Sequence, residues 1–174
     1  MAITIRELDR KTDRTAVEAI DTSFETDTVF DLVTTERRID LVERRLDAPL
    51  VKRYSIAEVF AHWARWQTGW VADDDGVRGF ATVEHEAWNA RLTLWFLYIA
   101  PAWRRRGVGR AVLHRVEAYG REVGANHVWI ETSSVNVPGV RAYERLGYSL
   151  CGADRTHYGP YMPDETAIFL AKTL

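Results

Sequence analysis

The sequence predicts an α/β fold, in which a mixed, mostly antiparallel sheet of about six to seven strands is flanked by about four helices. Short segments with alternating apolar and polar residues are interspersed with longer ones whose apolar residues recur every three to four positions. The 174 residues fit one domain of common size. No repeat, linker or low-complexity segment divides them, so residues 1–174 are predicted to form a single domain.

The chain up to Pro49 predicts one short helix and three strands. Alternation predicts a strand over 3–8, and Asp13 can cap a helix that runs to about residue 21. After a loop, strand signals return at 29–33 and at 39–46, and the second of these segments is interpreted as a hairpin partner of the first.

A second helix is predicted after Ser55. Ser55 and Glu58 have the spacing of a capping box, which marks the first turn of a helix. An apolar stripe follows at helical spacing, made of Ile56, Val59, Phe60, Trp63 and Trp66. Gly69 ends the predicted helix.

Three strands are predicted between residues 70 and 100. Segments 70–72 and 77–85 flank the turn Asp73–Gly76, which we interpret as a solvated hairpin turn because Asp-Gly between apolar runs is a strong hairpin signal. Leu94 to Ala100 is an almost uninterrupted apolar run, which fits a strand that is covered on both faces. Pro101 ends this strand.

A basic turn leads from that strand into the next helix. R-R-R-G-V-G-R spans Arg104 to Arg110, and the helix that follows has one apolar face, made of Val108, Val112, Leu113, Val116 and Tyr119. The first N–H groups of a helix lack intrahelical partners and favour phosphate, which Gly107 and Gly109 would allow to approach the backbone. The motif alone is also compatible with an arginine-rich surface loop that caps an ordinary helix.

The remaining chain predicts a strand, a helix and two closing strands. A strand is expected at 127–133, and Asn136-Val137-Pro138 opens a helix that Gly147 stops. The closing strands are expected at 148–152 and 166–172.

Composition argues against several classes of partner. The 23 Lys and Arg nearly balance the 25 Asp and Glu, so the whole chain has no bulk attraction for nucleic acid or an anionic membrane. Its first residues lack an apolar signal core, and no apolar run approaches the length that spans a membrane. Cys151 is the single cysteine, which excludes an intramolecular disulfide and suits a reducing cytoplasm. We therefore expect a soluble, cytoplasmic protein.

Neither metal chemistry nor thiol chemistry is predicted. No metal-ligand spacing relates the five histidines, which are His62, His85, His114, His127 and His157. Cys151 lies in a predicted strand, and no recognisable motif places a histidine beside it. We therefore interpret it as a buried structural thiol rather than a nucleophile that forms a covalent intermediate.

Two motifs resemble those of the GCN5-related N-acetyltransferase (GNAT) family. Arg104-x-x-Gly107-x-Gly109 resembles the loop that follows the fourth strand of this fold and holds the diphosphate of acetyl-CoA. W-I-E-T-S-S-V-N-V-P-G-V-R-A-Y-E-R-L-G-Y, from Trp129 to Tyr148, resembles the end of the same fold. The resemblance implies a GNAT domain that uses acetyl-CoA to acetylate an amine.

Within that family, the chain is similar to the streptothricin (nourseothricin) acetyltransferases, which inactivate an antibiotic by acetylating an amine of its β-lysine part. The matching segments are S-F-E-T-D-T-V-F, W-N-A-R-L-T, N-V-P, L-C-G-A-D and D-E-T-A. The similarity is weakest from about residue 37 to 69. It implies a primary amine of a small molecule as the acceptor and a role in antibiotic resistance. Family members are often homodimers, and the tryptophans from 63 to 70 could lie at such an interface.

The resemblance also implies which residues meet the cofactor. The backbone of Leu97, Tyr98 and Ile99 would pair with the pantetheine arm. The diphosphate would lie on Arg104, Arg105, Arg106, Gly107, Val108, Gly109 and Arg110. Asn136 and Tyr143 would face the cofactor, and Tyr143 is the candidate general acid that protonates the departing thiolate. Both have a purely structural alternative, since Asn136 could only cap its helix and Tyr143 could only fill a helix–sheet interface.

The acceptor site is where this chain departs from its relatives, which tend to carry acidic residues at the positions of Trp95, Phe96 and Tyr98. A cationic amine needs a carboxylate or an aromatic face to bind it. The candidate substrate-binding residues are therefore Asp27, Trp95, Glu131 and Asp154, with Glu165 as a further matching acid. Neighbouring strand residues face opposite ways, so at least one of Trp95 and Phe96 is expected to pack in the core.

Three alternative functions remain open on the sequence. The acceptor could be a polyamine, another aminated drug or a protein amino group. The domain could bind CoA without catalysis, although Tyr143 argues against this. Trp103 and the neighbouring arginines could form a nucleic-acid patch, although the near-neutral chain argues against that function.

Overall fold

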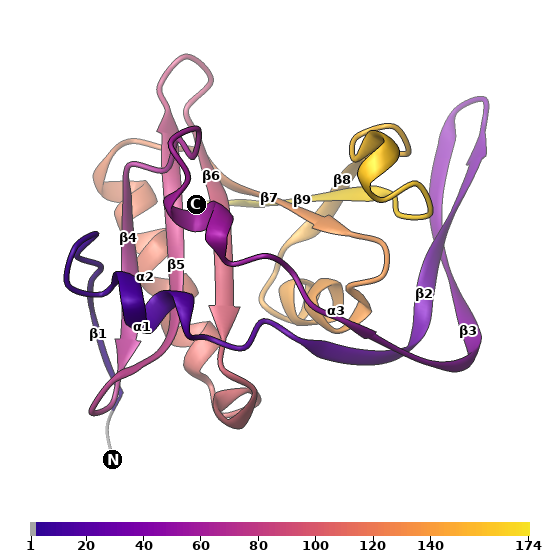
Figure 1. The fold of residues 1–174 in the computed structure, drawn as a ribbon. Helices are drawn as coiled ribbons and strands as arrows, with labels where there is room; N and C mark the ends of the chain where they lie inside the picture. Colours follow the sequence, from indigo (N-terminus) through magenta and orange to yellow (C-terminus); the bar gives the residue numbers. More distant parts are fainter. Residues whose placement is uncertain (1–2) are drawn as a thin grey trace. The chain divides into compact units, whose positions relative to one another are not determined.

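The computed structural model describes residues 3–174 and divides the chain into two compact units. The first comprises Met1–Phe24, Arg53–Val128 and Thr173–Leu174, and the second comprises Glu25–Lys52 and Trp129–Lys172. Figure 1 shows the elements of both. We describe each unit by itself.

The first unit is built on four antiparallel strands in the order β1-β4-β5-β6. Their bounds are Thr4–Glu7 for β1, Thr68–Asp73 for β4, Val77–Glu86 for β5 and Arg91–Ile99 for β6. Two helices accompany them, α1 (Arg14–Glu18) and α2 (Val108–Glu122). The strands, the turn and the two helices predicted in this region are present, although α1 ends at Glu18 rather than at about residue 21 and the helix expected after Ser55 is absent from the described residues.

Apolar side chains cover both faces of the two central strands, β4 and β5. α2 packs against β4, β5 and β6 through Val112, Leu113 and Val116, which are buried as its apolar stripe predicts. A second cluster contains Val17 of α1 and Phe80 of β5 together with Ile20, Val59, Trp66 and Val71. Burial on both faces fixes the positions of β6 and of the N-terminus of α2, which carry part of the candidate site.

A β-bulge in β6 changes which face its side chains meet. Phe96 pairs with Thr82 and Leu94 with Val83, so Trp95 is the extra residue between two successive pairs. Leu92, before the bulge, lies beside Gly120 near the end of α2, whereas Ile99, after it, lies beside Gly109 at the start of the same helix. An even-numbered and an odd-numbered residue therefore face one helix, which strict alternation forbids.

The prediction of an α-helix after Ser55 is wrong. The structure has only a short 3-10 helix, Ala57–Phe60, and Ser55 provides no cap, since the N-cap residue is Ile56 and makes no side-chain cap bond. The indole N–H of Trp66 donates to the carbonyl of Val59 at 2.5 Å. This bond uses a carbonyl that would accept a backbone N–H if the helix continued. Among the described residues there are thus three α-helices rather than about four.

The tryptophans from 63 to 70 are mostly core residues. Trp66 and Trp70 are 2% and 1% exposed, whereas Trp63 is 48% exposed. The proposed subunit interface is therefore wrong for Trp66 and Trp70, because both side chains are already covered within the chain.

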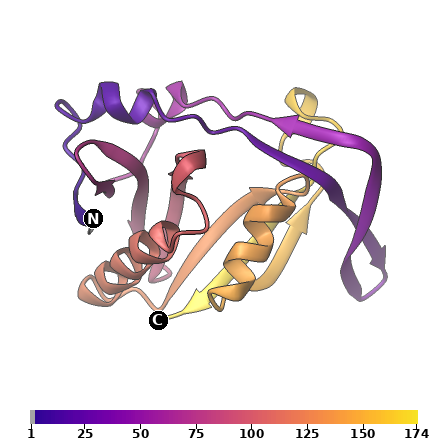
Figure 2. The same ribbon diagram turned by 90° about the horizontal axis from the view of Figure 1, so that it is seen from below.

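The second unit contains the strand series β7-β9-β8 and a separate two-stranded sheet, β2-β3. Strand β7 (His127–Ser133) enters it from the first unit, and β8 (Ser149–Asp154) pairs antiparallel with β9 (Ala167–Thr173). Helix α3 (Val137–Arg145) runs alongside β8 and β9 (Figure 2). With the four strands of the first unit, these three make seven, which agrees with the six to seven predicted from the sequence.

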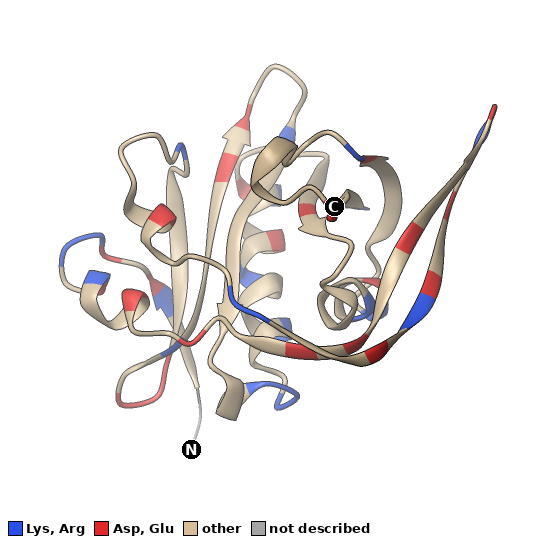
Figure 3. Ribbon diagram, turned by 45° about the vertical axis from the view of Figure 1, so that its right-hand side comes forward, with Lys and Arg blue, Asp and Glu red and all other residues tan. Residues whose placement is uncertain are grey.

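The β2-β3 sheet is longer than predicted. β2 spans Phe24–Thr35 and β3 spans Arg38–Lys52, whereas the sequence indicated only 29–33 and 39–46. Polar side chains extend both strands, because threonines favour extended backbone and opposite charges pair across the strands. Arg44 donates to Asp31 at 2.7 Å, and Figure 3 shows acidic and basic residues along this hairpin.

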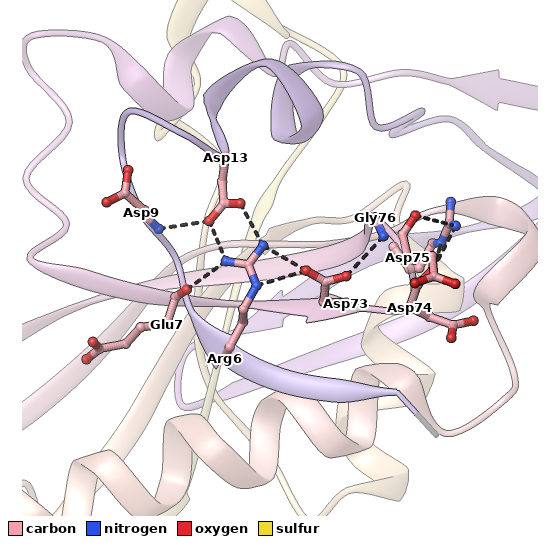
Figure 4. A network of polar contacts seen from close by, with 9 residues as sticks. Arg6, Glu7, Asp9, Asp13, Asp73, Asp74, Asp75 and Gly76 are labelled. Atoms are coloured by element: carbon pink, nitrogen blue, oxygen red, sulfur yellow. Dashed lines mark hydrogen bonds and ion pairs between the residues drawn. The ribbon is translucent and has the colours of Figure 1, made fainter. Parts of the chain in front are cut away.

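A network around Arg6 connects β1, the start of α1 and the β4–β5 turn (Figure 4). Arg6 donates two bonds of 2.7 Å to Asp13 and one of 2.8 Å to Asp73, whose other oxygen accepts from the amide of Gly76 at 3.0 Å. Asp13 therefore binds Arg6 and makes no side-chain cap on α1, contrary to the sequence prediction. Asp73 also accepts hydrogen bonds from Arg6 and Gly76, so its carboxylate is not simply solvated as the sequence analysis predicted for this turn.

We expect Asp13→Asn to lower the free energy of unfolding by about 2 kcal/mol at pH 7, the typical cost of losing a hydrogen bond to a charged group. The bonds from Arg6 hold the pKa of Asp13 below its ordinary value. This contribution is therefore present above the unfolded-state pKa of about 3.9 and is lost as pH falls through the lower folded-state pKa. Urea unfolding at pH 7 and in acid measures the difference, with exposed Asp75→Asn as the control; equal stability of the two variants at pH 7 would contradict the assignment.

Candidate active site

The predicted phosphate loop lies between β6 and α2 in the first unit. A 3-10 turn, Pro101–Trp103, follows β6, and α2 begins at Val108 with Gly107 as its N-cap. The first helical hydrogen bond runs from the amide of Ala111 to the carbonyl of Gly107 at 3.0 Å. The amides that precede Ala111 in α2 therefore have no intrahelical acceptor, and they form the kind of helix N-terminus that binds anions.

The two glycines of the loop leave space for a ligand in different ways. Gly107 has φ = +84°, a conformation that favours glycine, and an added Cβ there would meet no atom within 4 Å. An added Cβ at Gly109 would meet only Ile99, at an ordinary 3.7 Å. The backbone conformation thus favours glycine at position 107, whereas position 109 would tolerate alanine. The open space beside both residues would let a diphosphate approach the backbone.

The arginines of the loop have distinct environments. Arg104 is half-buried and donates to three backbone carbonyls, those of Ile99 at 2.8 Å, Ser23 at 2.6 Å and Asp21 at 3.3 Å. Burial lowers the pKa of its guanidinium, opposed by Asp21. The side chains of Arg105, Arg106 and Arg110 are exposed instead. Arg104 therefore anchors the loop, and the three exposed arginines supply its accessible positive charge.

The strand before the loop is less covered than predicted. Within β6, only Leu92 and Leu94 are buried, whereas Leu97, Tyr98 and Ile99 are half-buried. The prediction of a strand covered on both faces is therefore wrong for its final residues. One edge of this segment pairs with β5, where Leu97 lies opposite Ala81.

Trp95 and Phe96 belong to the first unit and pack against its second cluster. The indole N–H of Trp95 donates to Glu84 at 2.9 Å, and its ring lies 6.4 Å from that of Trp63. The expectation that at least one of Trp95 and Phe96 packs in the core is confirmed, and the bulge lets both do so.

Asn136 caps α3 in the second unit. Its Oδ1 accepts from the amide of Gly139 at 3.1 Å, and its Nδ2 donates to Thr132 at 2.9 Å. A Cβ at position 139 would collide with the Asn136 amide, so Gly139 is required for this arrangement. The capping role considered from the sequence is confirmed.

Tyr143 lies on α3 with its ring 5.9 Å from the ring of buried Tyr148, in an edge-to-face arrangement. Removal from water raises the pKa of its phenol above the ordinary value, and the negative charge of Glu131 raises it further. The phenol therefore remains protonated through the neutral range, as a proton donor must.

Glu131 lies on β7 and accepts a hydrogen bond from the phenol of Tyr158. Desolvation raises the pKa of this carboxyl, while Tyr158 and the charge of His157 act in the opposite direction. The sequence analysis did not identify Tyr158 or His157. The aromatic-rich segment D-R-T-H-Y-G-P-Y between the last two strands is the signal that could have found them.

The other candidate acids have partners of different kinds. Oδ1 of Asp154 accepts from the amide and the hydroxyl of Thr156, both at 2.7 Å, and these bonds lower the pKa of Asp154. Asp27 is exposed, 3.9 Å from Arg45, and lines a shallow cavity of about 360 Å³ between β2, β3 and the start of α3. Glu165 is paired with Lys52 and accepts from Ser133 at 2.5 Å. Glu131 and Asp154 thus share His157 as a neighbouring charge, whereas Asp27 and Glu165 belong to separate groups.

Three further observations concern thiol, metal and membrane chemistry. Cys151 lies in β8 as predicted, but its side chain is exposed, so the prediction of a buried thiol is wrong. Residues 3–174 hold no group of three or more His, Cys, Asp or Glu side chains arranged to bind a metal ion. None of the helices in this part of the chain is long and apolar enough to cross a membrane.

Comparison with known proteins gives consistent matches. The model of the acetyltransferase (GNAT) family matches residues 32–148. A streptothricin acetyltransferase from Streptomyces lavendulae is 37% identical over 172 residues, covering 93% of this chain and 90% of the relative. The crystal structure of a nourseothricin acetyltransferase is 35% identical, with a TM-score of 0.87 and 99% of each chain covered. A crystal structure from Bacillus anthracis in complex with acetyl coenzyme A shares the fold at 22% identity, with a TM-score of 0.84 and 99% and 100% of the two chains covered.

Proposed function

Because the chain belongs to the acetyltransferase (GNAT) family and is an acetyl-CoA-dependent N-acetyltransferase, we propose that it acetylates a primary amine of a streptothricin-type antibiotic. The observation that carries the proposal is the similarity to a streptothricin acetyltransferase along nearly the whole chain rather than over the cofactor motifs alone. The antibiotic would be inactivated, so the biological result would be resistance. A small-molecule amine is the acceptor class that this similarity supports.

Two structural features support cofactor binding in the first unit. The open N-terminus of α2 and the space at Gly107 and Gly109 suit the diphosphate, with exposed Arg105, Arg106 and Arg110 around it. The half-buried backbone of Leu97–Ile99 suits the pantetheine arm, and a main-chain N–H there would polarise the thioester carbonyl. Acetyl-CoA supplies the activated acetyl group, and these residues bind and orient it.

The second unit would provide the proton donor. Tyr143 holds a proton on its phenol and would give it to the departing thiolate. Asn136 caps the start of α3 by accepting from the amide of Gly139. In addition to this capping role, its side chain would face the cofactor. We assign Tyr143 as the catalytic acid.

Glu131 is the carboxylate that best suits a cationic acceptor. Its carboxyl is half-buried beside aromatic rings, whereas Asp154 organises its own turn and Asp27 lies exposed in a different cavity. Trp95 remains a candidate aromatic face for a cation on the sequence resemblance alone. We therefore place Glu131 at the centre of the acceptor site and Asp154 beside it.

A CoA-release screen tests the acceptor. The purified chain is incubated with acetyl-CoA and, separately, with streptothricin, other aminated antibiotics, polyamines and peptides. We expect streptothricin to give the highest kcat/KM, and mass spectrometry of the product to show one added acetyl group. A preference for a polyamine or for a peptide amino group would replace the proposed acceptor while leaving the family chemistry intact.

A further inference from the structure

One face of the second unit combines aromatic rings with the half-buried carboxylate of Glu131. Val128 and Ile130 of β7 are buried, whereas Trp129 and Glu131 alternate with them and are half-buried. Residues that alternate along a strand point to opposite faces, so Trp129 and Glu131 share the less covered face.

Ring contacts extend from Trp129 to a loop residue. Trp129 stacks on Phe169 with centroids 5.0 Å apart, and His157 meets the Phe169 ring edge-to-face at 5.7 Å. His157 lies in turn 5.2 Å from the ring of Tyr158, whose phenol donates to Glu131. The four aromatic side chains therefore form a continuous row of ring contacts that ends at the carboxylate of Glu131.

The two oxygens of Glu131 have different surroundings. Oε1 accepts a hydrogen bond from the phenol of Tyr158, so Oε2 is the oxygen that Tyr158 does not use. Asp154 differs, because its Oδ1 already accepts two hydrogen bonds from Thr156 in its own turn. Glu131 is thus the acid of this face that combines partial burial, an orientation held by Tyr158 and a second oxygen that Tyr158 does not use.

We propose that Oε2 of Glu131 binds the ammonium group of the acceptor and takes a proton from it, and that Tyr158 positions the carboxylate for this transfer. The proposal rests on the amine acetylation proposed above and identifies its general base. The aromatic faces of Trp129 and Phe169 would hold the cation near Glu131 before the transfer.

The proton transfer balances as follows. One N–H bond of the ammonium breaks, its proton forms an O–H bond on Oε2, and the nitrogen keeps the electron pair. The neutral amine then forms the N–C bond to the acetyl carbon while the C–S bond breaks, and Tyr143 protonates the sulfur. The nitrogen releases a second proton to solvent to become the amide, and Glu131 and Tyr143 recover their starting states by exchange with water.

The charged groups around Glu131 favour this role. Desolvation raises its pKa, which brings a carboxyl closer to the working range of a base at neutral pH. Tyr158 and His157 from the loop stabilise the carboxylate, and Tyr143 from α3 interacts with its charge. The raised pKa therefore makes the carboxylate of Glu131 a stronger base than an exposed glutamate.

The test compares Glu131→Gln, Tyr158→Phe and Tyr161→Phe across pH with one acceptor amine. Glu131→Gln should lower kcat by about 10²-fold, the range a positioned base supplies, with acetyl-CoA affinity unchanged. Tyr158→Phe should retain activity but move the acid limb of kcat/KM to higher pH, because it removes a bond that lowers the pKa of Glu131. Tyr161→Phe makes the same chemical change in the same loop at a side chain that is 91% exposed, and should leave the profile unchanged.

The outcomes separate this inference from the proposed function. If the wild-type chain acetylates the amine, either of two results would overturn the inference and leave amine acetylation in place. One is a normal kcat in Glu131→Gln, and the other is an unchanged acid limb of the kcat/KM profile in Tyr158→Phe. Failure of the wild-type chain to acetylate any amine would overturn both.

Discussion

Replacement of Tyr143 by phenylalanine is expected to lower kcat by about 10²-fold or more, with little change in acetyl-CoA affinity. The ring and its edge-to-face contact with Tyr148 remain, and only the phenolic proton is lost. Since its pKa is raised, the wild-type phenol keeps this proton across the neutral range, so the defect should persist over that range. Steady-state kinetics together with an acetyl-CoA binding titration separate the two quantities.

The leaving group provides a sharper measurement of the same role. An acetyl donor whose thiol is more acidic needs less protonation as it departs, so the defect of Tyr143→Phe should shrink with such donors. Tyr119→Phe is a matched control, because Tyr119 is a half-buried helix tyrosine whose ring packs 5.2 Å from Trp70. A defect of equal size with every donor would show that Tyr143 only fills space.

Replacement of Gly107 by alanine is expected to raise the acetyl-CoA KM by about tenfold or more, equivalent to about 1.4 kcal/mol of lost binding. Gly124, just beyond the opposite end of α2, is its matched control. Both glycines have positive φ, +84° and +77°, and an added Cβ at either would meet nothing within 4 Å. Each alanine variant should therefore lose about 1 kcal/mol of stability, but only Gly107→Ala should impair cofactor binding.

Gly109→Ala separates cofactor binding from stability in the same loop. The added Cβ would make an ordinary contact with Ile99, and alanine favours a helix more than glycine does. We expect an unchanged or higher unfolding temperature together with weaker acetyl-CoA binding, as measured by thermal unfolding with and without the cofactor. Equal acetyl-CoA affinity in the wild type, Gly107→Ala and Gly109→Ala would show that this loop does not bind the cofactor.

The sequence by itself determined the elements whose signals are local. The turn before β5, the glycine that begins α2 and the asparagine that caps α3 all depend on a few neighbouring residues, and the structure has each where the sequence places it. The apolar stripe of α2 is equally local, because a helix repeats its faces within a few residues. Motif spacing was sufficient to predict the family, and the comparisons with known proteins confirm this prediction.

Tertiary contacts decided the features that local patterns predicted wrongly. Asp13 has the position of a helix cap, yet Arg6 from β1 takes its carboxylate. The stripe after Ser55 has helical spacing, yet Trp66 reaches back to the carbonyl of Val59, and both side chains are buried in the same cluster. In each case a contact between residues seven positions apart outweighed a local preference that is worth about 1 kcal/mol.

The candidate site shows the same division. Gly107, Gly109, Asn136 and Tyr143 were predicted from motifs whose spacing resembles that of the family. The bulge at Trp95 and the bond from Tyr158 to Glu131 could not be predicted in this way, because they depend on strand register and on the path of a loop between two distant strands. Sequence patterns therefore determined which chemistry this chain performs, whereas only the tertiary structure decided which side chains surround Glu131, since residues 27 positions apart meet only after the chain has folded.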